Sequence, residues 1–137
     1  MMKLLLLFLG INILQSFVSG CSVLTYKHEV HIIRDLPPDA SPLKLHCASK
    51  TNDLGYHILS TNQDFHWNFC ENIVPNTLFF CHFWWESKEI AFDVFNAKWT
   101  GQTKSKYYWV IKSDGIYYYD DFAQKSEIKR YDWKNVK

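Results

Sequence analysis

Histidine and cysteine are the residue types in this chain best suited to metal binding or catalysis, and the sequence holds six histidines and four cysteines. His46, His66 and His82 each fall in a strand-like run, so their imidazoles could converge on a zinc ion if those strands are neighbours. His28 and His31 are three residues apart, a spacing that places them on opposite faces of a strand. Histidines of this kind are more often ordinary sheet-surface or half-buried residues. We therefore expect no metal and no other cofactor.

Sequence motifs for catalysis are missing. The chain contains no glycine-rich phosphate loop, no nucleophile elbow and no pair of carboxylates at an interpretable spacing. Its 15 basic and 14 acidic residues nearly cancel, leaving a net charge of +1. A histidine-based ribonuclease or a non-specific nucleic-acid binder needs a cationic phosphate site, which this balance does not favour. The sequence therefore argues against an enzyme and against a nucleic-acid partner.

The first 20 residues have the pattern of a secretory signal peptide. Lys3 precedes an apolar run that begins at Leu4, and Val18 and Gly20 suit the −3 and −1 positions of a cleavage site. The run is too short for a stable membrane span, although a retained anchor is the alternative. We expect cleavage before Cys21, which would release residues 21–137 as one extracellular domain without stable membrane insertion. Disulfides persist in that compartment.

Residues 21–137 show a hydrophobic period of two, which predicts strands rather than helices. Leu43, Leu45 and Cys47, for example, alternate with Lys44 and His46. Seven or eight such short runs, separated by turn signals, are typical of an all-β fold, an antiparallel β-sandwich. The expected strands are residues 30–33, 43–47, 56–59, 65–70, 78–85, 92–95, 107–112 and 116–119.

Two hairpins are expected within this sandwich. Residues 107–112 should pair with residues 116–119 across a turn that contains Gly115. Residues 65–70 and 78–85 should pair across a loop of suitable length, the second of them as a central strand covered on both faces because it is almost wholly apolar. The tail, residues 122–132, could form a short helix or a last strand.

The tryptophans admit a carbohydrate-binding interpretation. Trp84, Trp85, Trp99 and Trp133 could stack on sugar rings if they are exposed. In a sandwich of this size large aromatic residues are more often core, and we expect this for Trp67, Trp85 and Trp109. Trp99, in a loop beside Lys98, is expected to be partly exposed.

Several short motifs resemble, in order and spacing, those of the plant self-incompatibility S1 family, the S-protein homologues. Each motif alone is weak, but their number and order over residues 30–119 make the resemblance specific. The similar segments are VHIIRDL (30–36), LHCASK (45–50), DLG (53–55), FHWNF (65–69), TLFFCHFWW (77–85), FDVF (92–95), WVIK (109–112) and DGIY (114–117).

The resemblance implies a small secreted plant protein, because members of the family are of that kind. One member is a stigma protein that a pollen membrane protein recognises. The resemblance thus implies a non-enzymatic ligand that binds a plasma-membrane receptor on another cell, with pollen–pistil recognition as one role that it could have. We also expect the protein to be a monomer. The alternatives are a secreted carbohydrate-binding module and, less favoured, a small hydrolase.

A ligand of this kind is expected to be recognised through loops that rigid sheets carry. Nothing in the sequence separates such loops from ordinary solvated turns. The motif of Asp53, Leu54 and Gly55 is better explained as a turn that needs its glycine. The candidate receptor-binding residues are Asn72, Asn76, Glu86, Lys88, Lys98, Trp99 and Lys104.

The cysteines show where the chain departs from the family pattern. That pattern has four cysteines; Cys47 and Cys81 stand at the first two positions, and the last two are missing. Because the late two would be lost together if they pair with each other, the resemblance implies a Cys47–Cys81 disulfide. Parity then favours Cys21–Cys70. Cys70–Cys81 is the competing pair, since their strands are expected to form a hairpin.

Overall fold

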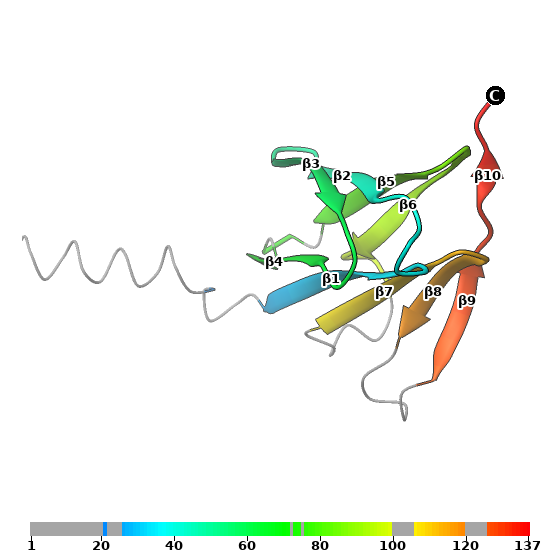
Figure 1. Cartoon of the computed structure of the whole chain (residues 1–137). Helices are drawn as coiled ribbons and strands as arrows, with labels where there is room; N and C mark the ends of the chain where they lie inside the picture. Colours follow the sequence, from blue (N-terminus) through cyan, green and yellow to red (C-terminus); the bar gives the residue numbers. More distant parts are fainter. Residues whose placement is uncertain (1–20, 22–25, 72, 75, 100–105, 120–125) are drawn as a thin grey trace, which may run out of the picture.

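The computed structural model describes residues 21, 26–71, 73–74, 76–99, 106–119 and 126–137. Its strands are β1 (Lys27–Asp35), β2 (Leu43–Ser49), β3 (Asp53–Leu59), β4 (Asp64–Cys70), β5 (Leu78–Trp85), β6 (Lys88–Asn96), β7 (Lys106–Lys112), β8 (Gly115–Tyr119), β9 (Glu127–Tyr131) and β10 (Lys134–Asn135). They form two five-stranded sheets, which lie one above the other in Figure 1. Sheet A has the order β4-β1-β7-β8-β9, and sheet B has the order β10-β6-β5-β2-β3.

The all-β sandwich expected from the sequence is confirmed. The signal-peptide prediction falls on residues outside the described part of the chain. Within the described part, no helix is long and apolar enough to cross a membrane.

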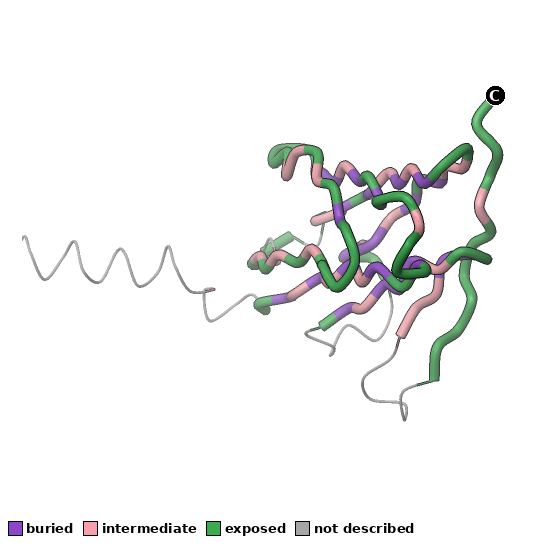
Figure 2. Tube along the Cα trace, in the orientation of Figure 1, coloured by how far each residue is buried: buried purple, intermediate pink, exposed green. Residues whose placement is uncertain are grey.

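The core lies between the two sheets, where alternate side chains of most strands point inward. Figure 2 shows the buried positions concentrated along the facing strands, whereas β9 is exposed throughout. Burying these aliphatic and aromatic side chains stabilises the fold by roughly 1.5–3 kcal/mol each, before the cost of chain ordering. The most completely buried apolar side chains are Val30, Ile32, Leu43, Leu45, Cys47, Cys81, Phe83, Val94, Phe95, Ile111 and Ile116.

One strand pairing departs from the expected antiparallel pattern. β1 pairs antiparallel with β4 but parallel with β7, with His31 opposite Tyr108 and Ile32 opposite Trp109. Hydrophobic alternation identifies which side of a strand faces the core, but it carries no information on the direction of a neighbour that is distant in sequence. The long connection from β1 to β7, through all of sheet B except β10, satisfies the spacing that a parallel pair needs.

The two expected hairpins have different outcomes. β7 and β8 pair antiparallel from Tyr108–Tyr119 to Lys112–Gly115, as the turn signal indicated. β4 and β5 do not form a hairpin, because β4 lies at the edge of sheet A and β5 lies inside sheet B. The segment between them therefore crosses from one sheet to the other. The tail forms strands β9 and β10, so the described chain has ten strands rather than seven or eight.

The edge position of β4 explains a difference in burial. Phe65, Trp67 and Phe69 face the core as expected, but they are only half-buried because β4 has a neighbour on one side alone. Trp85 and Trp109 are buried, as expected. Trp67 thus packs at the margin of the core rather than in its centre.

Two disulfides fasten this framework. Cys47 of β2 and Cys81 of β5 are directly opposite in sheet B, both point into the core, and their Cα atoms are 4.1 Å apart. Cys21 is joined to Cys70, at the end of β4, with a Cα–Cα distance of 5.3 Å. These are the pairs that the resemblance and parity favoured. The competing Cys70–Cys81 pair is not formed, because those strands lie in different sheets.

Candidate functional site

The outer face of sheet B, which points away from sheet A, carries an aromatic surface. In β2, Leu43, Leu45 and Cys47 point inward, so Lys44 and His46 point outward. The antiparallel register places Ile58 and Trp84 beside Lys44, and Tyr56 and His82 beside His46, on the same side of the sheet. Phe80 follows in the next outward row, opposite Ala48. We call this surface the aromatic face: Lys44, His46, Tyr56, Ile58, Phe80, His82 and Trp84.

The rings of the aromatic face lie nearly flat on one another. His46 stacks on Tyr56 with 4.3 Å between ring centroids and 14° between planes. His82 stacks on Trp84 at 3.8 Å and 16°, and Tyr56 lies 6.1 Å from Trp84. Such contacts between rings restrict side-chain rotation, which lowers the entropy cost of binding a partner.

A lysine adds positive charge at the centre of the face. The Lys44 ammonium lies 5.1 Å from the centroid of the Tyr56 ring and 5.2 Å from that of Trp84. At these distances the cation is attracted by both rings. Within the described part of the chain, Lys44 makes no ion pair with a carboxylate, so its charge is available to an acidic group on a partner.

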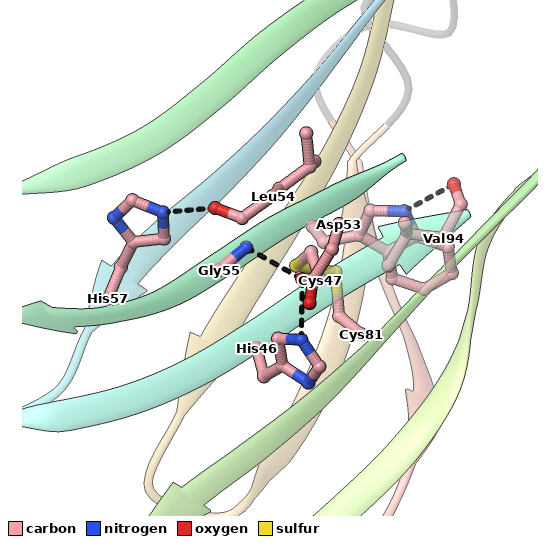
Figure 3. Close-up of a disulfide and its surroundings, with 9 residues drawn as sticks. His46, Cys47, Asp53, Leu54, Gly55, His57, Cys81 and Val94 are labelled. Carbon is pink, nitrogen blue, oxygen red and sulfur yellow. Dashed lines mark hydrogen bonds and ion pairs between the residues drawn. A yellow bond between two sulfur atoms is a disulfide. The ribbon is translucent and has the colours of Figure 1, made fainter. Parts of the chain in front are cut away.

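The β2–β3 turn holds one end of the face in place. Figure 3 shows the carboxylate of Asp53 between His46 and Gly55. It accepts a hydrogen bond from the Gly55 N–H at 2.9 Å and lies 2.7 Å from His46 Nε2. These two contacts, the Gly55 one first, lower the pKa of the Asp53 carboxyl. Gly55 has φ of 81°, so this position does need a glycine, but Asp53, Leu54 and Gly55 lie at the start of β3, where its ladder with β2 is irregular, rather than in the expected turn.

His82 has a buried polar atom at the face, although its side chain as a whole is 32% exposed. Its Nε2 atom is buried and has no hydrogen-bond partner among the described residues. Glu89 Oε1 lies 3.8 Å away, which is too long for a hydrogen bond. A polar atom in this position costs free energy unless a partner satisfies it.

The histidines do not form the zinc site that their spacing could have given. His46 and His82 are opposite each other in sheet B, whereas His66 lies on β4 in sheet A. His28 is buried and contacts Glu71 at 3.1 Å, and His31 is half-buried on the other face of β1, as the three-residue spacing required. The three candidate histidines are thus divided between the two sheets.

The His46–Asp53 pair resembles part of a catalytic arrangement but lacks a nucleophile. His46 Nε2 contacts only the Asp53 carboxylate, and no hydroxyl or thiol within the described residues is hydrogen-bonded to this histidine. A hydrolase of the serine or cysteine type needs such a group within hydrogen-bond reach of its base. The pair links β2 to the start of β3.

The candidate loop residues are spread over both ends of sheet B. Glu86, with φ of 53°, lies in the β5–β6 turn, and Lys88 begins β6, with its ammonium 5.3 Å from the Trp85 ring centroid. Asn76 and Trp99 lie at the opposite end, where the Ala97 N–H donates to the Thr77 carbonyl at 2.8 Å. The structure does not bring the two groups together.

The end that holds Asn76 also has a cavity. It has a volume of about 620 Å³ and is lined by the β2–β3 turn, the end of β4 and the start of β5. Lys98 is exposed there and Trp99 is 37% exposed, which agrees with the expected partial exposure. Asn72 and Lys104 lie outside the described residues.

The aromatic face was missed from the sequence. The alternation of Lys44 and His46 with apolar residues showed that they share a side, but β5 was expected to be covered on both faces. In the structure nothing among the described residues covers its outer face, and Phe80 is 40% exposed. The tryptophans considered for sugar stacking lie in different places: Trp85 is buried, Trp133 packs against Trp85, and Trp84 lies on the aromatic face.

Comparison with known proteins identifies relatives over most of the chain. The family model of the plant self-incompatibility protein S1 matches residues 29–133. S-protein homolog 18 of Arabidopsis thaliana is 42% identical over 85 residues, which are 60% of this chain and 60% of the relative. S-protein homolog 5 of the same plant is 40% identical over 74 residues, 54% of this chain and 58% of the relative. The match thus spans about three fifths of the length of these relatives.

A solved structure has the same fold. It is similar with a TM-score of 0.65 and 16% identity, over 81% of this chain and 97% of the other. It is described as a structure of SPH (Self-Incompatibility Protein Homologue) proteins, a widespread family of small, highly stable, secreted proteins from plants. The residues that the family model matches begin in β1 and end at Trp133, and they include both Cys47 and Cys81. The chain belongs to the plant self-incompatibility protein S1 family.

Proposed function

We propose that this protein is a secreted, non-enzymatic ligand that acts by binding a plasma-membrane protein on another cell. Its family and the secreted nature of the solved relative support this, as does the signal-peptide pattern of residues 1–20. Two disulfides suit a domain that works in an oxidising compartment.

The observation that carries the proposal is the exposure of the aromatic face. Tyr56 is 62% exposed and Ile58 is 66% exposed on the same side of sheet B, next to the half-buried Trp84. Contiguous apolar surface on a small protein marks a place of contact with another macromolecule. Tyrosine and tryptophan are also the residues that most often dominate the binding energy of protein interfaces.

The chemistry of the face suggests what the receptor presents. Apolar side chains of the receptor would match the exposed Tyr56 and Ile58, and an acidic side chain would match the ammonium of Lys44. Asp53 and Glu89 flank the face, so basic groups at the margin of the receptor surface would complete the match. The occupant is thus a protein surface with an apolar centre, an acidic group opposite Lys44 and a basic margin.

Binding to protoplasts tests this function, because protoplasts present plasma-membrane proteins without a cell wall. Fluorescently labelled protein should bind saturably, and mild protease treatment of the protoplasts should abolish binding. The double variant Tyr56→Ala/Ile58→Ala should weaken binding by roughly 10- to 100-fold. Binding that survives protease treatment would contradict a protein receptor.

A matched control removes the same side chains elsewhere. Tyr26 and Ile128 are 71% and 54% exposed and lie outside the aromatic face. The double variant Tyr26→Ala/Ile128→Ala removes the same two types of side chain as Tyr56→Ala/Ile58→Ala and should bind as the unaltered protein does. Equal losses of binding in the two double variants would show that the aromatic face is not the binding surface.

Carbohydrate binding is the second candidate function. Tyr56, which is 62% exposed, and the half-buried Trp84 lie 6.1 Å apart on the aromatic face, and aromatic rings of this kind stack on sugar rings. In this case labelled protein would bind a glycan array or isolated wall polysaccharide, and Trp84→Ala would abolish that binding. Protease treatment of protoplasts would then have no effect.

Pollen–pistil recognition is the narrower role that the family name suggests. It requires that the protein be secreted where pollen lands. Expression confined to stigma or style would support this role, whereas expression in roots or leaves would favour a role in development or defence.

A further inference from the structure

We propose that His31, His66 and Asp64, on the outer face of sheet A, bind a zinc ion. One nitrogen from each histidine and one oxygen of the aspartate lie within 4.8 Å of one another. We call these three residues the His–Asp cluster. It lies on the opposite side of the sandwich from the aromatic face, so this proposal is independent of the proposed function.

The strand register brings the three residues together. β1 and β4 run antiparallel with His31 directly opposite His66, which puts both imidazoles on one side of the sheet. Asp64 precedes His66 by two residues and so points to the same side, opposite Ile33 and diagonal to His31. Two adjacent strands therefore supply three donors on one side of the sheet.

One ligand of the cluster is held in place by its neighbours. The His31 ring lies between the rings of His66, 5.0 Å away at 19°, and Tyr108, 4.8 Å away at 22°. Its side chain is 19% exposed, whereas those of His66 and Asp64 are 59% and 54% exposed. The cluster thus combines one fixed donor with two that can turn toward an ion.

The donor set is suited to zinc. Neutral imidazole nitrogens and a carboxylate oxygen are its usual ligands besides cysteine, at about 2.0–2.2 Å. Small rotations of the exposed His66 and Asp64 side chains would bring the donors from 4.8 Å to the spacing that such bonds need. Calcium and magnesium prefer sites built only of oxygen atoms, so two histidines disfavour them.

Negative charge near the cluster favours a divalent cation. Asp64 Oδ2 lies 3.9 Å from His66 Nδ1, and Glu29 Oε2 lies 3.4 Å from His31 Nε2. The carboxylates of Asp64 and Glu29 thus place negative charge beside the donor atoms. Bound zinc would neutralise this charge and fasten the edge strand β4 to β1.

Zinc titration of the intact, disulfide-bonded protein tests the proposal. Isothermal titration with zinc chloride should show one ion bound with a micromolar dissociation constant, and calcium chloride should show none. His66→Ala and Asp64→Asn should each weaken zinc binding by at least about tenfold. Circular dichroism and the melting temperature would show that these exposed substitutions leave the fold intact.

A control in sheet B separates this site from the other histidine pair. His46→Ala should leave zinc binding unchanged, and in NMR spectra the ring protons of His31 and His66 should shift on zinc addition while those of His46 and His82 do not. Loss of binding in His46→Ala but not in His66→Ala would overturn the proposal. So would the absence of zinc binding below millimolar concentration.

Discussion

The indole of Trp109 joins the two sheets by donating a hydrogen bond from Nε1 to the carbonyl oxygen of Val94 at 3.0 Å. Trp109 belongs to β7 in sheet A and Val94 to β6 in sheet B. Phe79 pairs with Phe95 and Phe80 with Asp93, so Val94 is the extra residue of a β-bulge. The tryptophan thus satisfies a buried carbonyl group at the point where the regular ladder is interrupted.

Trp109→Phe should lower the free energy of unfolding by about 1–3 kcal/mol, because it leaves the Val94 carbonyl buried without its donor. Urea denaturation followed by circular dichroism measures the loss. Trp133→Phe is the matched control: it removes a bond of 2.8 Å to the Lys112 carbonyl at a partly exposed site, where water can replace the donor. Equal losses in the two variants would contradict the special role of Trp109.

The two disulfides should contribute unequally to stability. Each closes a long loop, with sequence separations of 34 for Cys47–Cys81 and 49 for Cys21–Cys70, for which the loop-entropy model gives about 4 kcal/mol in both cases. Cys47 and Cys81 are fully buried, so replacing both by alanine also leaves a cavity in the core. Guanidinium denaturation should therefore show the larger loss for Cys47→Ala/Cys81→Ala. A larger loss for Cys21→Ala/Cys70→Ala would be the opposite result.

Two glycines should respond differently to alanine. At Gly55 a Cβ atom meets nothing within 4 Å, so Gly55→Ala costs only the backbone strain of a positive φ, about 1–2 kcal/mol. At Gly115 a Cβ atom would lie 2.7 Å from the Tyr131 carbonyl oxygen of β9 and 2.6 Å from Lys129 Cε. Gly115→Ala should therefore cost more, because overpacking adds about 1–3 kcal/mol. Thermal unfolding of both variants measures the difference, and an equal or smaller cost at Gly115 would contradict the close approach of β9.

Tyr107 should make stability fall at high pH. Its burial, with smaller effects of Tyr118 and Glu71, raises the pKa of Tyr107 to about 12. Between pH 10 and 12 the unfolded chain loses this proton while the folded chain keeps it, so the free energy of the unfolded state falls relative to that of the folded state and stability declines. Titration at 295 nm should show one tyrosine that ionises later than the others, and Tyr107→Phe should lose this step. A step that stays in Tyr107→Phe would assign the late ionisation to another residue.

The sequence was informative wherever a local pattern determines structure. Alternation placed Leu43, Leu45 and Cys47 in the core, and the turn before Gly115 located the β7–β8 hairpin. Which strands are neighbours was harder to predict, because the pairing of β1 with β7 depends on residues far apart in the chain. The same limit hid the His–Asp cluster, since nothing local to His31 indicates that His66 lies opposite.

The aromatic face shows a second limit. Alternation tells which residues share a side of a strand, but it does not tell whether another layer covers that side. The outward residues of β5 are as apolar as its inward ones, which favoured a doubly covered strand. Only the layer arrangement reveals that Tyr56, Ile58 and Trp84 form part of an outer surface.

Photocrosslinking from the aromatic face tests the central claim most directly. A photoreactive phenylalanine in place of Tyr56 should give, on protoplasts, a covalent adduct with a membrane protein, whereas the same amino acid in place of Tyr26 should give none. An adduct of equal yield from position 26, or saturable binding without any adduct from position 56, would contradict recognition through this face.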